Sequence, residues 1–252
     1  METSLLGSLR VRRLVKQRGP AGRGKALGAR PLTCVFLHGF GAPGDDLVGL
    51  ADGIDVPQNT TFVFPEAPHS LQDFLFEPLY GDARAWWMID MGAMERAIVR
   101  GELRDLRGQV PDGLAEARRA VMSMLDALAV EEADKPEEAR GRLVLGGFSQ
   151  GAMLSLDVAL RARELPLAGI VLLSGTLIAE QQWSPLFAGR RGARVFQSHG
   201  EQDPILPFSI ATTLRDRLIE AGLDVTFDPF QGPHTIPPAT LARLGAWLHA
   251  LA

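Results

Sequence analysis

The motif Gly147-Phe148-Ser149-Gln150-Gly151 constrains the fold of this chain more than any other feature of its sequence. The apolar run before it, residues 143–145, predicts a buried strand, and residues 152–161 after it form a helix-compatible run without Pro or Gly. A serine on a sharp turn from a strand into a helix has the setting of a nucleophile elbow. Glycines beside the turn let two backbones pass close together. The alternative interpretation is a glycine-rich turn with an incidental serine.

Strand-like and helix-like segments alternate along the chain, which predicts an α/β fold with a mainly parallel, doubly wound sheet and helices on both faces. We expect strands over residues 8–16, 33–38, 61–65, 142–147, 168–174, 193–199 and 224–230. We expect helices near residues 45–53, 112–129, 151–163, 208–222 and 237–250. No linker divides the chain, so residues 31–252 are expected to form one catalytic domain.

A reactive serine needs a base, and in this fold class the chain order is Ser, then Asp or Glu, then His. Of the five histidines, His234 and His249 lie beyond Asp203, the acid favoured below. His249 falls in the last turn of the expected C-terminal helix, an ordinary place for a solvated histidine. His234 falls in a loop between an expected strand and that helix, so we predict that it is the base.

The acid is expected between the serine and His234, and the two candidates are Glu201 and Asp203. Both follow an expected strand, whereas Asp157 and Glu164 lie on or after the elbow helix. We favour Asp203, because Glu201 sits immediately after Gly200 in the turn. A carboxylate there can accept the imidazole N–H and fix its tautomer. The alternative is a solvated turn in which Asp203 caps the following helix.

An oxyanion hole needs two backbone donors, one after the nucleophile and one in the loop after an early strand. These donors are predicted to be the N–H groups of Gln150 and Phe40, the latter in a loop with glycines at 39, 41 and 44. His38, at the start of the same loop, is interpreted as structural, with its ring bonded to backbone.

Four blocks together resemble the phospholipase/carboxylesterase family of small α/β-hydrolases, which includes acyl-protein thioesterases and bacterial carboxylesterases. The blocks are 37–41 (Leu-His-Gly-Phe-Gly), 147–151 (Gly-Phe-Ser-Gln-Gly), 199–207 (His-Gly-Glu-Gln-Asp-Pro-Ile-Leu-Pro) and 234–236 (His-Thr-Ile). The resemblance runs from about Pro31 to the C-terminus and implies a triad of Ser149, Asp203 and His234.

Two features depart from the family pattern. Pro233 stands directly before His234 where the family usually has Gly, and Gly232 is one place earlier. Residues 91–110 look longer and more charged than expected, and could form a lid or a pocket wall.

The substrate pocket is expected to use aromatic and apolar side chains, although some of these could simply fill the core. The Trp-containing segment 85–90 resembles a family motif near the substrate pocket. The candidates are Trp86, Trp87, Met88, Phe74, Leu75 and Phe76.

The N-terminal 30 residues carry eight basic side chains and one acid, whereas the whole chain has 26 basic and 30 acidic residues. Leu9 and Val11 alternate with Arg10 and Arg12, which favours an Arg-rich edge strand followed by a loop over a transit peptide. No apolar run suggests a secretory signal or a membrane span.

Composition limits the possible partners. A net charge of −4 gives no general attraction to nucleic acid. No metal-ligand spacing or nucleotide-binding motif is present, so we expect no cofactor and no metal. Cys34 cannot form an internal disulfide and is interpreted as a core residue, which suits a cytoplasmic protein. The expected protein is a monomer or homodimer.

The sequence therefore predicts a serine hydrolase that cleaves small-molecule or acyl esters, or thioesters, through an acyl-enzyme. The alternatives are an acyl-protein thioesterase or lysophospholipase, another hydrolase on this scaffold that acts on peptides or lactones, and a ligand-binding protein without turnover.

Overall fold

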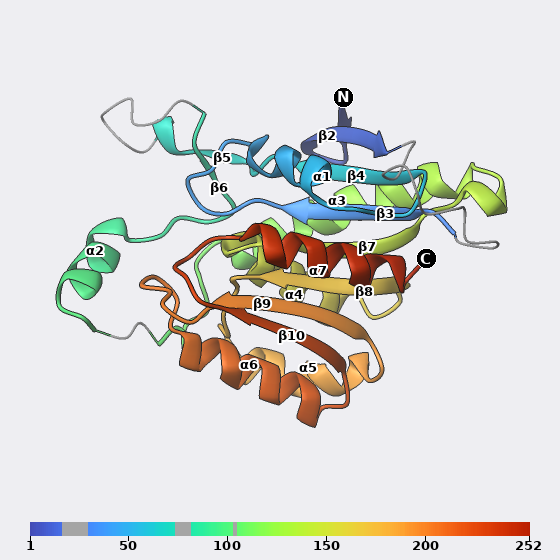
Figure 1. Ribbon diagram of the computed structural model, residues 1–252. Helices are drawn as coiled ribbons and strands as arrows, with labels where there is room; N and C mark the ends of the chain where they lie inside the picture. The colour runs from blue at the N-terminus through green and yellow to red at the C-terminus, as the bar shows by residue number, and fades with distance from the viewer. Residues whose placement is uncertain (17–29, 74–81, 103–104) are drawn as a thin grey trace.

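The computed structural model describes residues 1–16, 30–73, 82–102 and 105–252. Its centre is an eight-stranded sheet in the order β1-β2-β4-β3-β7-β8-β9-β10 (Figure 1). The strands are β1 (Glu2–Leu6), β2 (Leu9–Lys16), β3 (Leu32–Leu37), β4 (Thr60–Pro65), β7 (Arg142–Phe148), β8 (Leu167–Leu173), β9 (Arg194–Gly200) and β10 (Asp224–Phe230). The six strands from β4 to β10 are parallel, and β1 and β2 are antiparallel to their neighbours.

Helices cover both faces of the sheet, as expected for this fold class (Figure 1). One apolar core packs beneath α3 (Leu114–Ala133), α4 (Gln150–Arg161), α5 (Glu180–Phe187) and α6 (Phe208–Glu220). The other core packs beneath α1 (Leu50–Gly53) and α7 (Pro238–His249). The apolar stripe of α3 faces the first core, because its buried residues recur every three or four positions: Leu114, Ala117, Val121, Met124, Leu125 and Leu128.

Shorter elements lie between β4 and α3. The strands β5 (His69–Ser70) and β6 (Arg84–Ala85) form a separate two-stranded sheet. The helix α2 (Met91–Val99) follows and stands apart from the main body in the ribbon view (Figure 1). Short 3-10 turns occur at Asp46–Gly49, Leu71–Asp73, Glu137–Ala139 and Ala188–Arg190.

The N-terminal region differs from the expected edge strand. Strand β2 has two partners, β1 on one side and β4 on the other, so β1 is the edge of the sheet. Gly7 makes the tight turn between β1 and β2 with φ of 54°, a left-handed conformation that glycine adopts without strain. The alternation of Arg with apolar side chains favours an edge position for β2, because it suggests solvated Arg side chains. In the structure Arg12 instead bonds the buried Glu66, which follows β4.

Cys34 lies on the central strand β3 and is fully buried. Burial raises the pKa of its thiol, so the neutral form dominates and the residue serves packing, as expected. In the described part of the chain, no helix combines the length and the apolar character that a bilayer crossing requires.

The order of the strands indicates where a ligand-binding site would lie on the sheet. From β3 the chain moves outward to β4 on one side, and later returns to β7 on the other side of β3. The loops that follow β3 and β7 therefore diverge and leave a crevice at the carboxyl ends of these two strands. Ligands of open α/β sheets bind at such a switch point.

Candidate active site

Ser149 stands at the end of the central strand β7, immediately before α4. Its backbone has φ of 54° and ψ of −117°, a conformation that non-glycine residues rarely adopt. Two backbone hydrogen bonds hold this strained turn. The Ser149 N–H donates to the Leu173 carbonyl (2.8 Å), and the Ser149 carbonyl accepts the Ala152 N–H (3.0 Å). This is the backbone geometry of a nucleophile elbow.

The flanking glycines are required by space. A Cβ placed on Gly151 would collide with the carbonyl group of Leu37, and one on Gly147 would collide with the same carbonyl oxygen and with the Gly151 backbone. The elbow and strand β3 are thus in backbone contact, which only glycine permits.

Ser149, His234 and Asp203 lie in a hydrogen-bonded row. The Ser149 Oγ is 2.8 Å from Nε2 of His234, and Nδ1 of His234 is 2.6 Å from Oδ2 of Asp203. The Asp203 carboxylate can only accept a hydrogen bond, so Nδ1 of His234 carries a proton and donates it, and Nε2 is free to accept the serine proton. The structure brings together the three residues that the sequence analysis selected. Glu201 instead contacts the exposed Gln231, and His249 lies near Asp55.

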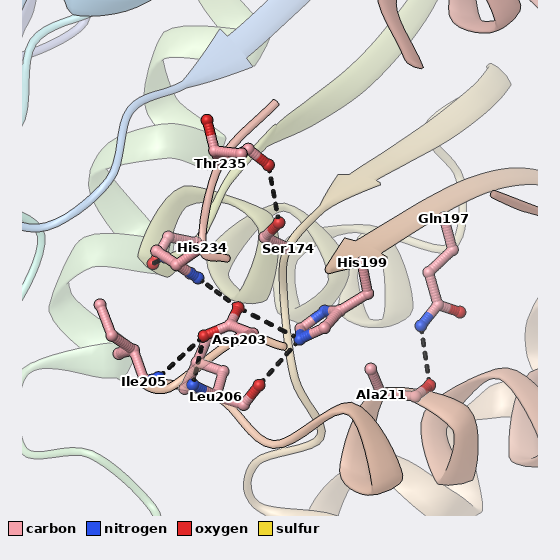
Figure 2. A network of polar contacts seen from close by, with 10 residues as sticks. Ser174, Gln197, His199, Asp203, Ile205, Leu206, Ala211, His234 and Thr235 are labelled. Atoms are coloured by element: carbon pink, nitrogen blue, oxygen red, sulfur yellow. Dashed lines mark hydrogen bonds and ion pairs between the residues drawn. The ribbon is translucent and has the colours of Figure 1, made fainter. Parts of the chain in front are cut away.

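Asp203 is held on both carboxylate oxygens (Figure 2). Its Oδ1 accepts the N–H groups of Ile205 (2.8 Å) and Leu206 (2.9 Å), in the turn that leads to α6. Burial by itself would raise the pKa of Asp203, but hydrogen bonds from His199 and His234 outweigh it and hold the pKa well below its ordinary value. Asp203 is therefore ionised and fixed in orientation.

His199 is a member of this network that sequence reasoning did not assign. Its Nε2 lies 2.8 Å from the Leu206 carbonyl and 3.3 Å from Oδ2 of Asp203, so two acceptors share the Nε2 proton (Figure 2). The ring is fully buried, and its Nδ1 has no partner among the described residues. The available signal was its place at the buried end of β9, four residues before Asp203.

The loop that carries His234 is braced from two sides. The Ser174 hydroxyl donates to the Thr235 carbonyl (3.2 Å; Figure 2). The Gln202 N–H donates to the Gly232 carbonyl (3.1 Å). The Phe148 ring packs against the imidazole with centroids 4.8 Å apart. Pro233, the departure from the family pattern, therefore leaves the imidazole directed at the serine.

The two residues proposed as oxyanion donors line the same cavity as the serine. Phe40 and Gln150 both line it, and neither N–H donates a hydrogen bond to the described residues. His38 holds the Phe40 loop as expected: its Nδ1 bonds the Gly39 carbonyl (2.8 Å), and its Nε2 accepts the Ala67 N–H (3.1 Å). Burial lowers the pKa of His38, which favours this neutral ring.

The cavity above Ser149 has a volume of about 820 Å³, within the range of pockets that hold small organic ligands. Its lining includes Met91, Ala93, Met94, Asp105, Leu106, Gln109 and Val110, so the described parts of the segment 91–110 contribute to the cavity wall. The apolar lining includes Met88, Ile89, Met91, Met94, Leu106, Met153 and Ile178.

The residues expected to line the substrate pocket differ in where the structure places them. Trp87 and Met88 line the cavity. Trp86 does not: it is fully buried, and its indole N–H donates to the His38 carbonyl (3.0 Å), so its expected role as a pocket wall is wrong. Phe74, Leu75 and Phe76 lie outside the described residues.

Fold and site geometry together define a serine hydrolase of the α/β-hydrolase fold. Residues 105–251 match the family model described as Phospholipase/Carboxylesterase. Acyl-protein thioesterase 1 of Yarrowia lipolytica is 30% identical over 79% of this chain and 82% of its own length. Acyl-protein thioesterase 1 of Neurospora crassa is 25% identical over 82% of this chain and 81% of its own.

Solved structures agree. Esterase PE8 is 29% identical with a TM-score of 0.65, covering 94% of this chain and 100% of the esterase. Zea mays acyl-protein thioesterase 2, at 22% identity, shares the fold with a TM-score of 0.67, over 96% and 98% of the two chains. The chain belongs to the phospholipase/carboxylesterase family, and it is a serine hydrolase that acts on ester or thioester bonds.

Proposed function

We propose that Ser149, His234 and Asp203 are the catalytic triad of an esterase or thioesterase that works through an acyl-enzyme. The observation that carries this proposal is the continuous hydrogen-bonded row from the Ser149 hydroxyl through His234 to Asp203, at the floor of an open cavity.

In the first half of the reaction, His234 Nε2 takes the Ser149 proton as Oγ attacks the substrate carbonyl carbon. The N–H groups of Phe40 and Gln150 stabilise the negative oxygen of the tetrahedral intermediate. His234 then gives its proton to the leaving alcohol or thiol, and the acyl group remains on Ser149. Asp203 stays ionised throughout and stabilises the imidazolium.

In the second half, a water molecule takes the place of the leaving group. His234 accepts a proton from this water, which attacks the acyl-enzyme carbonyl. Collapse of the second tetrahedral intermediate returns the proton to Ser149 and releases the carboxylic acid. Substrates with an apolar acyl chain suit the methionine-rich cavity wall, because burial of each CH₂ group contributes roughly 0.8 kcal/mol.

A thioester of an acylated protein is the second candidate substrate, favoured by the names of the two fungal relatives. The same cavity would hold the acyl chain, and a thiolate is a better leaving group than an alkoxide. We also propose a cytoplasmic location, because the single cysteine, Cys34, is buried and free, as suits a reducing compartment.

The test is hydrolysis of p-nitrophenyl esters from acetate to palmitate, with an S-acyl N-acetylcysteamine series beside it. Wild type and Ser149→Ala are compared, and a fluorophosphonate probe reports serine activation. We expect turnover that rises beyond acetate, no probe labelling of the variant and a loss of about 10³-fold or more in kcat. Unchanged turnover by Ser149→Ala would refute the proposed nucleophile.

A further inference from the structure

The segment Arg84 to Trp87, here called the strap, touches both halves of the proposed oxyanion hole. Strand β6 begins the strap, and Trp86 and Trp87 complete it. On one side the strap bonds the loop that carries Phe40. On the other side it bonds the side chain of Gln150, whose own N–H is the second donor.

The Phe40 loop is fixed to the strap by three hydrogen bonds. The Gly41 N–H donates to the Arg84 carbonyl (2.8 Å), and the Arg84 N–H donates to the Ala42 carbonyl (3.1 Å). The Trp86 indole N–H donates to the carbonyl of His38 (3.0 Å). Bonds therefore flank Phe40 on both sides, and its own N–H makes no hydrogen bond to the described residues, although the residue lines the cavity.

Gln150 holds the other end of the strap with both atoms of its carboxamide. Its Oε1 accepts the backbone N–H of Trp86 (2.9 Å), and its Nε2 donates to the backbone carbonyl of Trp87 (2.8 Å). Both Gln150 and Trp86 are fully buried, so water cannot replace these bonds. The pairing needs one acceptor and one donor on the same side chain, a combination that an amide provides and a carboxylate does not.

The strap is itself anchored from behind. The Arg84 guanidinium contacts the buried Glu66 (3.0 Å) and donates to the Ala67 carbonyl (3.2 Å). Ala67 in turn donates its N–H to the His38 ring. The strap is therefore a fixed element and can set the positions of groups bonded to it.

We propose that the side chain of Gln150 is a positioning residue, which together with the strap sets the spacing of the Phe40 and Gln150 N–H groups around the developing oxyanion. The inference rests on the proposed oxyanion roles of these two amides. Oxyanion donors act in the transition state, and small misplacements of reacting groups can cost up to about 100-fold in rate. Loss of the carboxamide is therefore expected to lower kcat and leave KM nearly unchanged.

The experiment compares Gln150→Met with wild type on one p-nitrophenyl ester. We expect kcat to fall about 10- to 100-fold, with KM within about threefold. A trifluoromethyl ketone, which forms a tetrahedral adduct with the serine, should bind the variant more weakly by a similar factor. The product carboxylic acid, which forms no tetrahedral adduct, should bind both proteins equally.

Gln197→Met is the matched control. Gln197 is also fully buried and donates to a backbone carbonyl, that of Ala211 (2.8 Å; Figure 2). It belongs to strand β9, and its side chain makes no hydrogen bond to the strap within the described part of the chain. Its replacement should lower stability and leave kcat within about twofold. If Gln150→Met does not fold, Trp86→Phe tests the other end, because it removes the indole N–H and keeps a ring.

The outcomes separate the inference from the proposed function. If Ser149→Ala is inactive while Gln150→Met keeps wild-type kcat and tetrahedral-adduct affinity, the positioning role is overturned and the triad stands. If Gln150→Met and Gln197→Met lose equal activity, the loss reflects general destabilisation and the positioning role is likewise overturned. Turnover by Ser149→Ala would overturn the mechanism on which both depend.

Discussion

Oδ2 of Asp203 lies 2.6 Å from Nδ1 of His234, although the two residues are 31 positions apart in the chain. The contact exists because the loops after β9 and β10 pack backbone against backbone. A Cβ on Gly200 would collide with the carbonyl oxygens of Gly232 and Pro233. The approach of these loops brings the carboxylate to the imidazole.

Asp203→Asn should lower kcat by about 10⁴-fold, because the amide favours the wrong histidine tautomer, as in other serine triads. The measurement is steady-state hydrolysis of a p-nitrophenyl ester at neutral pH. Glu201→Gln is the matched control, since Glu201 is exposed and contacts Gln231. A larger loss for Glu201→Gln than for Asp203→Asn would reassign the acid.

His199→Phe should lower the free energy of unfolding by about 1.5–3 kcal/mol at neutral pH, the cost of a lost hydrogen bond to a charged group. His199→Gln keeps an N–H donor and should cost less. Urea unfolding followed by fluorescence gives both values. Equal costs for the two variants would contradict the importance of the Nε2–H donor.

The stability lost in His199→Phe should also depend on pH. The low folded pKa of Asp203 contributes stability that is present above its ordinary value of 3.8 and is lost as pH falls through the folded value. His199→Phe raises that pKa toward 3.8. The difference between wild type and His199→Phe should therefore be largest at neutral pH and shrink below about pH 4. A difference that grows on acidification would contradict this assignment.

Gly151→Ala should destabilise the protein by more than about 2 kcal/mol and abolish activity, because its Cβ would overlap the Leu37 carbonyl group. Gly49→Ala is the matched control: no atom lies within 4 Å of its added Cβ, so stability should change by no more than about 0.5 kcal/mol. Thermal unfolding measures both. A stable, active Gly151→Ala protein would show that the elbow and β3 do not pack as described.

Much of the parallel sheet could be predicted from the sequence, because its strands are continuous apolar runs bounded by loops. Residues 33–38, 168–174 and 193–199 match β3, β8 and β9 within one or two positions. The chain order of Ser149, Asp203 and His234 selected three residues that the structure places in one hydrogen-bonded row, since the loops after parallel strands meet at one edge.

Other features depend on tertiary contacts that no local pattern contains. Strand β1 has four exposed or partly exposed residues of five, and forms because it pairs with β2. Helix α5 contains Pro185, which argues against a helix by propensity. The direction of Trp86 is set by the His38 carbonyl, 48 positions away, so the sequence could not distinguish a pocket wall from a buried anchor.

The buried His38 ring predicts a second loss of folding stability in acid, at a higher pH than the loss from Asp203. Burial lowers its folded pKa below the ordinary 6.5, so between these two values the unfolded chain binds a proton that the folded protein does not. Stability should therefore fall as pH drops below about 6.5, by at most about 1.4 kcal/mol per pH unit for this group. His38→Gln removes the titrating ring, so the stability of this variant should depend less steeply on pH.

Urea unfolding at half-unit steps from pH 8 to pH 5 measures the difference between wild type and His38→Gln. Parallel curves are expected above pH 7.5, where His38 is neutral in both states. Curves that stay parallel down to pH 5 would show that His38 is as easily protonated in the folded protein as in the unfolded chain.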